Sequence, residues 1–208
     1  MKKYLRLVII GALAVPSVLV SAQTPCENGM ADIYPCSGVD LMSHMTLAEI
    51  GGGDNANDIW GWTDPESGHE YALVGRSHGV SFIDVTDPVN PVFVARLGSH
   101  ISGGTLWRDI KVYQNHAFIV SEQGGHGLQV FDLQQLDEVA VDDMPFSFNE
   151  TAYYDGFGNA HNVAINEETG FAYGIGTNTF GGGLHVVDIS DPLNPVLAGG
   201  HESSGYTH

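Results

Sequence analysis

An internal repeat constrains this chain more than any other feature. The segment VSFIDVTDPVNPV at Val80–Val92 returns about a hundred residues later as LHVVDISDPLNPV at Leu184–Val196, and a shorter third copy, LQVFDLQQL, begins at Leu128. Repetition at intervals of tens of residues is typical of solenoids, propellers and arrays, in which each repeat is one supersecondary unit. The fold is therefore expected to consist of copies of one small motif.

Each copy predicts a unit of four short strands. The repeated segment is apolar up to an aspartate, and in two copies an Asp-Pro turn then ends the strand. A second apolar run lies upstream, joined to the first through glycines, which indicates a hairpin. Further runs lie upstream of that hairpin and after the proline turns. The predicted strands begin at Asp58, Tyr71, Val80 and Val92, then at Asp109, Ala117 and Leu128, and then at Asn162, Phe171, Leu184 and Val196.

The spacing of the copies predicts the architecture. Ile59, Ile110 and Val163 hold the same position in the three copies and are 51 and 53 residues apart. A four-stranded propeller blade takes ~40 to 50 residues. Helical periodicity is absent outside the N-terminus, which excludes a helical solenoid. We predict an all-β fold, a β-propeller with about three four-stranded blades in residues 51–208; a β-sandwich is the alternative.

The N-terminal residues 1–22 have the pattern of a signal peptide. Lys2, Lys3 and Arg6 precede an apolar stretch from Leu7, and small residues end the segment at Ala22. As a membrane anchor the stretch is shorter than the ~20 residues that a spanning helix needs. We therefore expect an exported protein that is extracellular, periplasmic or at the cell surface.

The chain has only two cysteines, Cys26 and Cys36, in the segment 23–50. In an oxidising compartment two such cysteines pair by default, so a disulfide is predicted between them. A zinc or redox pair is the alternative, but it requires a two-residue spacing or further ligands nearby.

The charge of the chain excludes one class of partner. Without residues 1–22 the net charge is −21, with four basic residues against 25 acidic ones. Such a chain does not bind nucleic acid. Acidity of this kind keeps a secreted chain soluble, or alternatively binds divalent cations. The stretch from Asp54 to Asp58 offers oxygen ligands for calcium but lacks the glycine of an EF-hand loop, and Asp58 also recurs in the repeat as Asp109.

Four polar residues share one position of the repeat. Asn57, Arg108 and His161 each stand immediately before the first predicted strand of a unit, and His208 takes the same position at the end of the chain. In a propeller these side chains converge at one mouth of the central channel, where such folds bind ligands. The alternative is that they cap strand ends and bond to neighbouring blades.

The remaining residues carry no diagnostic catalytic motif. The chain has no nucleophile elbow, P-loop or dinucleotide fingerprint. His78 and His126 each precede a glycine within a hairpin, where we expect them to bond the turn backbone.

Several longer segments resemble a known family. The two FIDVTDPVNPV-like segments resemble LVIVD repeats. Together with PCENGMADIYPCSGVDLMSH, WRDIKVYQNHAFIVSEQGGHGLQVFDL and AHNVAINEETGFAYGIGT, they resemble the choice-of-anchor B family of exported bacterial proteins over nearly all of the chain after the leader. The resemblance implies a repeat-built propeller, often held at the cell surface by a variable C-terminal anchor. It implies no catalytic residues.

The end of the chain bears on what the whole protein does. Gly205 to His208 match Gly158 to His161, so a further unit is expected to begin there, with any anchor lying beyond residue 208. We expect a non-enzymatic exported module that binds an extracellular protein or glycan. The alternative is a metal-dependent hydrolase of phosphatase or lactonase type, in which Asp58, Asp109 and His161 converge on a metal such as calcium or zinc.

Overall fold

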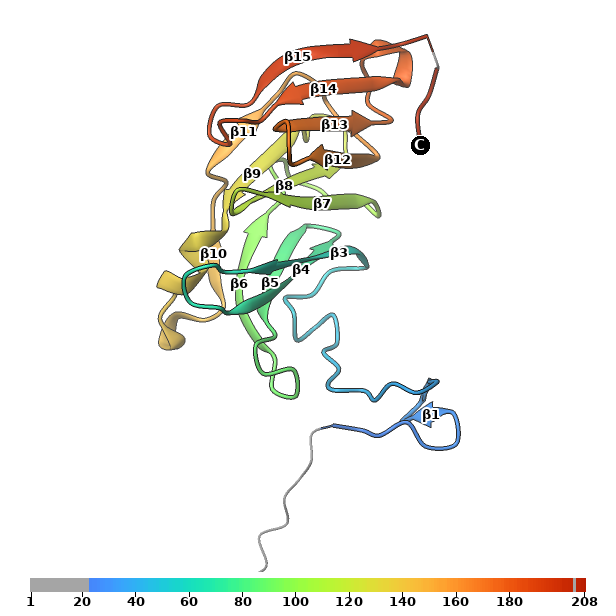
Figure 1. The fold of residues 1–208 in the computed structure, drawn as a ribbon, viewed down its shortest axis with the longest axis vertical. Coiled ribbons are helices and arrows are strands. Elements are labelled where there is room, and N and C mark those ends of the chain that lie inside the picture. Colours follow the sequence, from blue (N-terminus) through green and yellow to red (C-terminus); the bar gives the residue numbers. More distant parts are fainter. Residues whose placement is uncertain (1–22, 204) are drawn as a thin grey trace, which may run out of the picture. The chain divides into compact units, whose positions relative to one another are not determined.

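The computed structural model describes residues 23–203 and 205–208, and its regular secondary structure consists of β-strands and three short 3₁₀ helices (Figure 1). The predicted signal peptide lies outside these residues. None of the helices in the described ranges has the length and apolar character needed to cross a membrane. The strands are β1 (Met30–Ala31), β2 (Tyr34–Pro35), β3 (Ala56–Thr63), β4 (Glu70–Arg76), β5 (Gly79–Asp84), β6 (Val92–Gly98), β7 (Arg108–Tyr113), β8 (His116–Ser121), β9 (Leu128–Asp132), β10 (Phe146–Phe148), β11 (Ala152–Tyr154), β12 (Asn162–Asn166), β13 (Phe171–Ile175), β14 (Leu184–Asp188) and β15 (Val196–His201).

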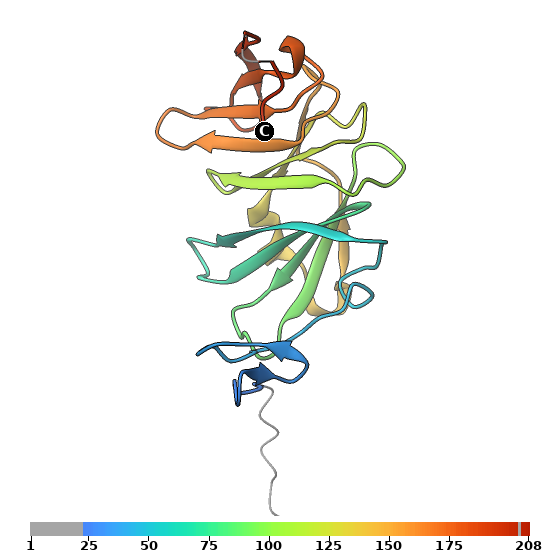
Figure 2. The same ribbon diagram turned by 90° about the vertical axis from the view of Figure 1, so that its right-hand side faces the viewer.

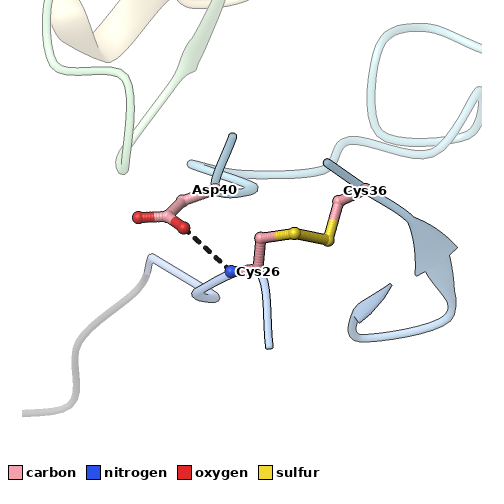
Figure 3. The surroundings of a disulfide bond; sticks show 3 residues. All are labelled: Cys26, Cys36 and Asp40. Atoms are coloured by element: carbon pink, nitrogen blue, oxygen red, sulfur yellow. Dashed lines mark hydrogen bonds between the residues drawn. A yellow bond between two sulfur atoms is a disulfide. The ribbon is translucent and has the colours of Figure 1, made fainter. Parts of the chain in front are cut away.

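The chain divides after Leu41 into two compact units. In the first unit, β1 pairs antiparallel with β2, and the predicted disulfide between Cys26 and Cys36 is confirmed (Figure 3). Asp40 accepts a hydrogen bond from the backbone N–H of Cys26 at 2.8 Å. With so few strands, we expect this unit to depend on its covalent link for order.

Breaking this disulfide is expected to expose the first unit to proteolysis. Replacing both Cys26 and Cys36 by serine removes the constraint on a short loop and lets the unfolded forms of residues 23–41 gain entropy. Limited proteolysis with a protease of broad specificity, followed by mass spectrometry, should then show early cuts within residues 23–41 in the variant. Equal cleavage rates in variant and wild-type protein would show that the disulfide does not order this unit.

The second unit, Met42–His208, contains three larger sheets that follow the predicted repeat. Their strand orders are β10-β6-β5-β4-β3, β11-β9-β8-β7 and β12-β13-β14-β15, which we call sheets 1, 2 and 3. The predicted strands pair antiparallel in sequence order in all three sheets, so the four-stranded unit is confirmed in sheets 1 and 3, and the three strands predicted for sheet 2 are confirmed there. Figures 1 and 2 show the three sheets following one another along the unit.

The proline turns are built as expected from their sequence. Asp87 accepts hydrogen bonds from the backbone N–H of Val89 and the side-chain amide of Asn90, and Asp191 bonds Leu193 and Asn194 in the same way. These bonds fix the chain reversal that separates β5 from β6 and β14 from β15.

The second copy of the repeat departs from this pattern. After β9 the chain enters a 3₁₀ helix at Leu133–Glu138, because Gln134 and Gln135 stand where the other copies have their turn. The insertion then supplies β10, which pairs parallel with β6 of sheet 1, before β11 completes sheet 2. The insertion therefore covers one edge of sheet 1, an arrangement that the repeat did not predict.

The core lies between successive sheets. Ile110 is completely buried in the cluster formed with sheet 1, and Val163 is 2% exposed in the cluster formed with sheet 2. Ile59, which holds the same repeat position in sheet 1, is 62% exposed. The face of sheet 1 that carries Ile59 therefore corresponds to the buried faces of sheets 2 and 3, but within the second unit neither of these two sheets packs on it.

Candidate functional site

The first residues of β3, β7 and β12 surround one pocket. Each of these strands forms one edge of its sheet, and they lie next to one another in Figure 1. The pocket has a volume of about 420 Å³, and we call it the strand-start pocket. It contains all four residues predicted for binding and all three predicted for a metal. The lining residues are Asn57, Asp58, Trp107, Arg108, Asp109, His161, Asn162 and His208.

Asn57 and Asp58 reach from sheet 1 to the backbone of β7. Asp58 lies at a β-bulge with a φ of 63°, a conformation that aspartate tolerates better than most residues and that redirects its side chain. Its Oδ2 accepts a hydrogen bond from the N–H of Ile110 at 2.8 Å, and Asn57 Oδ1 accepts one from the N–H of Arg108 at 3.1 Å. These bonds join sheet 1 to sheet 2 at the pocket.

Asp109 repeats this contact one sheet further along. Its Oδ2 accepts hydrogen bonds from the N–H of Val163 at 2.8 Å and from the side-chain amide of Asn162 at 3.1 Å. Its Oδ1 lies 2.6 Å from Lys111 Nζ and also accepts from the N–H of Ile110. The same repeat position therefore bridges successive sheets twice, through Asp58 and through Asp109.

The two aspartates differ in their protonation. Burial raises the pKa of Asp58, and its hydrogen bond with Asp109 raises that pKa further. Burial also acts to raise the pKa of Asp109, but hydrogen bonds from Lys111 and Val163 outweigh it, so this pKa is lowered. Asp58 thus retains a proton to higher pH than Asp109, and the charge of Asp109 is balanced by Lys111.

Arg108 lines the pocket, but its guanidinium group turns into the protein. The residue is 2% exposed, and the group donates hydrogen bonds to the carbonyl of Arg76, to Ser99 Oγ and to His126 Nε2. Burial, followed by repulsion from Arg76, lowers the pKa of Arg108 to about 10. The guanidinium group therefore donates its hydrogen bonds within the protein and does not point into the pocket as a free cation.

His161 is held by a carboxylate on the neighbouring sheet. Its Nδ1 lies 2.5 Å from Oε1 of Glu122, which follows β8, so Nδ1 carries the proton and Nε2 is the ring nitrogen without this contact. The imidazole of His208 lies 4.5 Å from that of His161, centroid to centroid. Trp107 contacts His161 edge-to-face at 6.2 Å. An aromatic and imidazole wall thus faces the aspartates and amides.

Three residues of the site, Trp107, Glu122 and Asn162, were missed by reasoning from the sequence, which identified Asn162 only as the start of a strand. Trp107 directly precedes Arg108, and a tryptophan beside a predicted site residue was a usable signal; the structure shows it 43% exposed. Glu122 follows β8 in a glycine-rich stretch and has no carboxylate counterpart in the other copies, where Ser77 and Gly176 or Thr177 stand nearby, so the repeat pattern concealed it.

The predicted metal ligands lie together but are already engaged. Both carboxylate oxygens of Asp109 accept hydrogen bonds, Asp58 bonds Ile110 and Asp109, and His161 pairs with Glu122. Within residues 23–203 and 205–208, no group of three or more His, Cys, Asp and Glu side chains is arranged to hold a metal ion.

Comparison with known proteins identifies the repeat itself. No curated protein matches the chain. Residues 157–202, which contain β12 to β15, match the model of the LVIVD repeat, the resemblance already carried by the segment Leu184–Val196.

Proposed function

We propose that this chain is an exported binding module of β-propeller type and that its ligand binds in the strand-start pocket. The LVIVD repeat and the all-β fold are consistent with a propeller-like module. The resemblance to the choice-of-anchor B family, the leader-like residues 1–22 and the disulfide favour a protein that works outside the cytoplasm.

The exposed face of sheet 1 favours the propeller arrangement. Ile59 pairs with Val74 on that face, as Ile110 pairs with Ile119 on the face of sheet 2 that is buried against sheet 1. The segment from Ser43 to Ile50 lines a groove on the same face. A face with this composition is suited to receive another sheet of the same kind, which is how propeller blades pack around an axis.

The binding function is supported by three polar side chains of the pocket, each of which uses only one of its two polar atoms in a structural hydrogen bond. Asn57 Oδ1 accepts from the N–H of Arg108, Asn162 Nδ2 donates to Asp109, and His161 Nδ1 donates to Glu122. In each case the second polar atom of the side chain has no partner among the described residues. Structural bonds therefore fix these groups in place while leaving hydrogen-bonding capacity in the pocket, as a binding site requires.

A hydrolase requires more than the pocket provides in this form. That alternative depends on Asp58, Asp109 and His161 converging as free ligands, whereas their contacts hold the sheets together. Nothing in the pocket pairs a hydroxyl or thiol nucleophile with a base. We therefore propose binding and not hydrolysis.

Photo-crosslinking from the edge of the pocket tests this proposal. Leu106 is 47% exposed and adjoins Trp107 without lining the pocket, so Leu106→Cys accepts a photoreactive maleimide beside an intact site. The native cysteines are paired in the disulfide and do not react. After illumination with extracellular material from the producing cells, we expect a discrete adduct at position 106.

A second leucine gives the matched control. Leu193 is 50% exposed on a turn and does not line the pocket, so Leu193→Cys should yield no comparable adduct. Adducts of equal yield at both positions, or none at position 106, would contradict a ligand site in the strand-start pocket. The chemical nature of the adduct does not decide this point.

A further inference from the structure

We propose that the ligand of the strand-start pocket is a neutral glycan, with one sugar ring stacked on Trp107; this proposal rests on the binding function proposed above. Three features of the pocket lead to it: its carboxylates already have hydrogen-bond partners, its free polar atoms both donate and accept hydrogen bonds, and an exposed tryptophan is among its lining residues.

The engagement of the carboxylates argues against an ionic ligand. Asp109 pairs with Lys111 at 2.6 Å, and Glu122 accepts a hydrogen bond from His161 Nδ1 at 2.5 Å. Asp58 is bonded to the backbone of β7. A bound anion would be repelled by these carboxylates, and the guanidinium of Arg108 is buried and does not offset that repulsion. A bound cation would have to displace the existing partners of the carboxylates. A neutral ligand incurs neither of these free-energy costs.

The free polar atoms match hydroxyl groups. The amide nitrogen of Asn57 donates, the amide oxygen of Asn162 accepts, and Nε2 of His161 is available opposite its bond to Glu122. A hydroxyl both donates and accepts, so one class of group satisfies all three positions. Because each side chain is already fixed by a structural bond, little conformational freedom is lost when a ligand binds.

Trp107 supplies the surface that a sugar ring requires. Pyranose rings have an apolar C–H face and a polar edge, and an indole plane beside amides complements both. Trp107 is 43% exposed, lines the pocket, and lies edge-to-face with His161. A peptide is less well matched, because the residues that line the pocket include no aliphatic side chain to form an apolar anchor site.

The test is binding of the purified full chain to an array of neutral, amine-bearing and acidic glycans, followed by fluorescence titration of the best neutral oligosaccharide. Trp107→Ala should weaken that binding by on the order of tenfold or more. Asn57→Asp keeps Oδ1 as the acceptor for Arg108 but removes the free donor, and it should weaken binding to a similar degree. The tryptophan emission of wild-type protein should shift on titration.

Phe146→Ala is the matched control, because Phe146 is also 43% exposed but lies on β10, away from the residues that line the pocket. It should bind as wild type does. Preference for amine-bearing or acidic glycans, binding that survives Trp107→Ala, or no glycan binding on the array would overturn the proposal. A protein or lipid adduct in the crosslinking experiment would also overturn it while leaving the binding function intact.

Discussion

Asp109→Ala is expected to lower the free energy of unfolding by about 3 kcal/mol. The substitution leaves the N–H of Val163 without its acceptor in a region where Val163 is 2% exposed, and it leaves Lys111 without its carboxylate. For a unit of this size the melting temperature should fall by about 6 to 12 °C. Thermal and urea unfolding followed by circular dichroism measure both quantities.

Two further variants distinguish the hydrogen bond to Val163 from the ion pair with Lys111 and provide a surface control. Asp109→Asn retains an oxygen for Val163 but loses the charge that faces Lys111, so its effect should be intermediate. Asp142→Ala alters an exposed aspartate in a short 3₁₀ helix and should change stability by no more than about 0.5 kcal/mol. If Asp109→Ala were as mild as Asp142→Ala, the bridge between sheets 2 and 3 would not hold them together.

Protonation of His126 is expected to destabilise the protein as the pH falls from 6.5 to 4. Burial, followed by the charge of Arg108, lowers the pKa of His126 to about 4, whereas in the unfolded chain it is near 6.5. Because the unfolded state binds the proton first, stability is complete above pH 6.5 and is lost as the pH drops toward 4. The loss from this group is about 2 kcal/mol between pH 7 and pH 5, and about 3 kcal/mol in total.

The comparison with His126→Gln isolates this contribution from the carboxylates that also titrate. Glutamine offers an oxygen to Arg108 in place of Nε2 and carries no titrating group. Stability measured by urea unfolding at pH 7, 6 and 5 should therefore fall less steeply in the variant. Parallel pH profiles for the two proteins would show that His126 is not kept neutral by its burial.

The strands were predictable because apolar runs, aspartates and proline turns are local signals. Each strand that the repeat predicted is present, from β3 at Ala56–Thr63 to β15 at Val196–His201. The insertion after β9 was not predictable in this way. Strand β10 is only three residues long and pairs with β6, some 50 residues earlier in the chain, so no local pattern indicates its partner.

The candidate site was predicted in position but not in detail. The repeat placed Asn57, Arg108, His161 and His208 together because equivalent positions of stacked units share one end of the strands. It did not reveal that Arg108 turns inward toward His126. That histidine was expected to bond its turn, and it does contact the carbonyl of Gly127, but it is completely buried. Burial depends on how two sheets pack, which a single sequence does not state.

Binding of the ligand in the strand-start pocket is measured most directly by the yield of crosslinked adduct at position 106 relative to position 193. We expect a discrete adduct with Leu106→Cys and little or none with Leu193→Cys, although the two leucines are almost equally exposed. Equal yields, or an adduct confined to position 193, would contradict it.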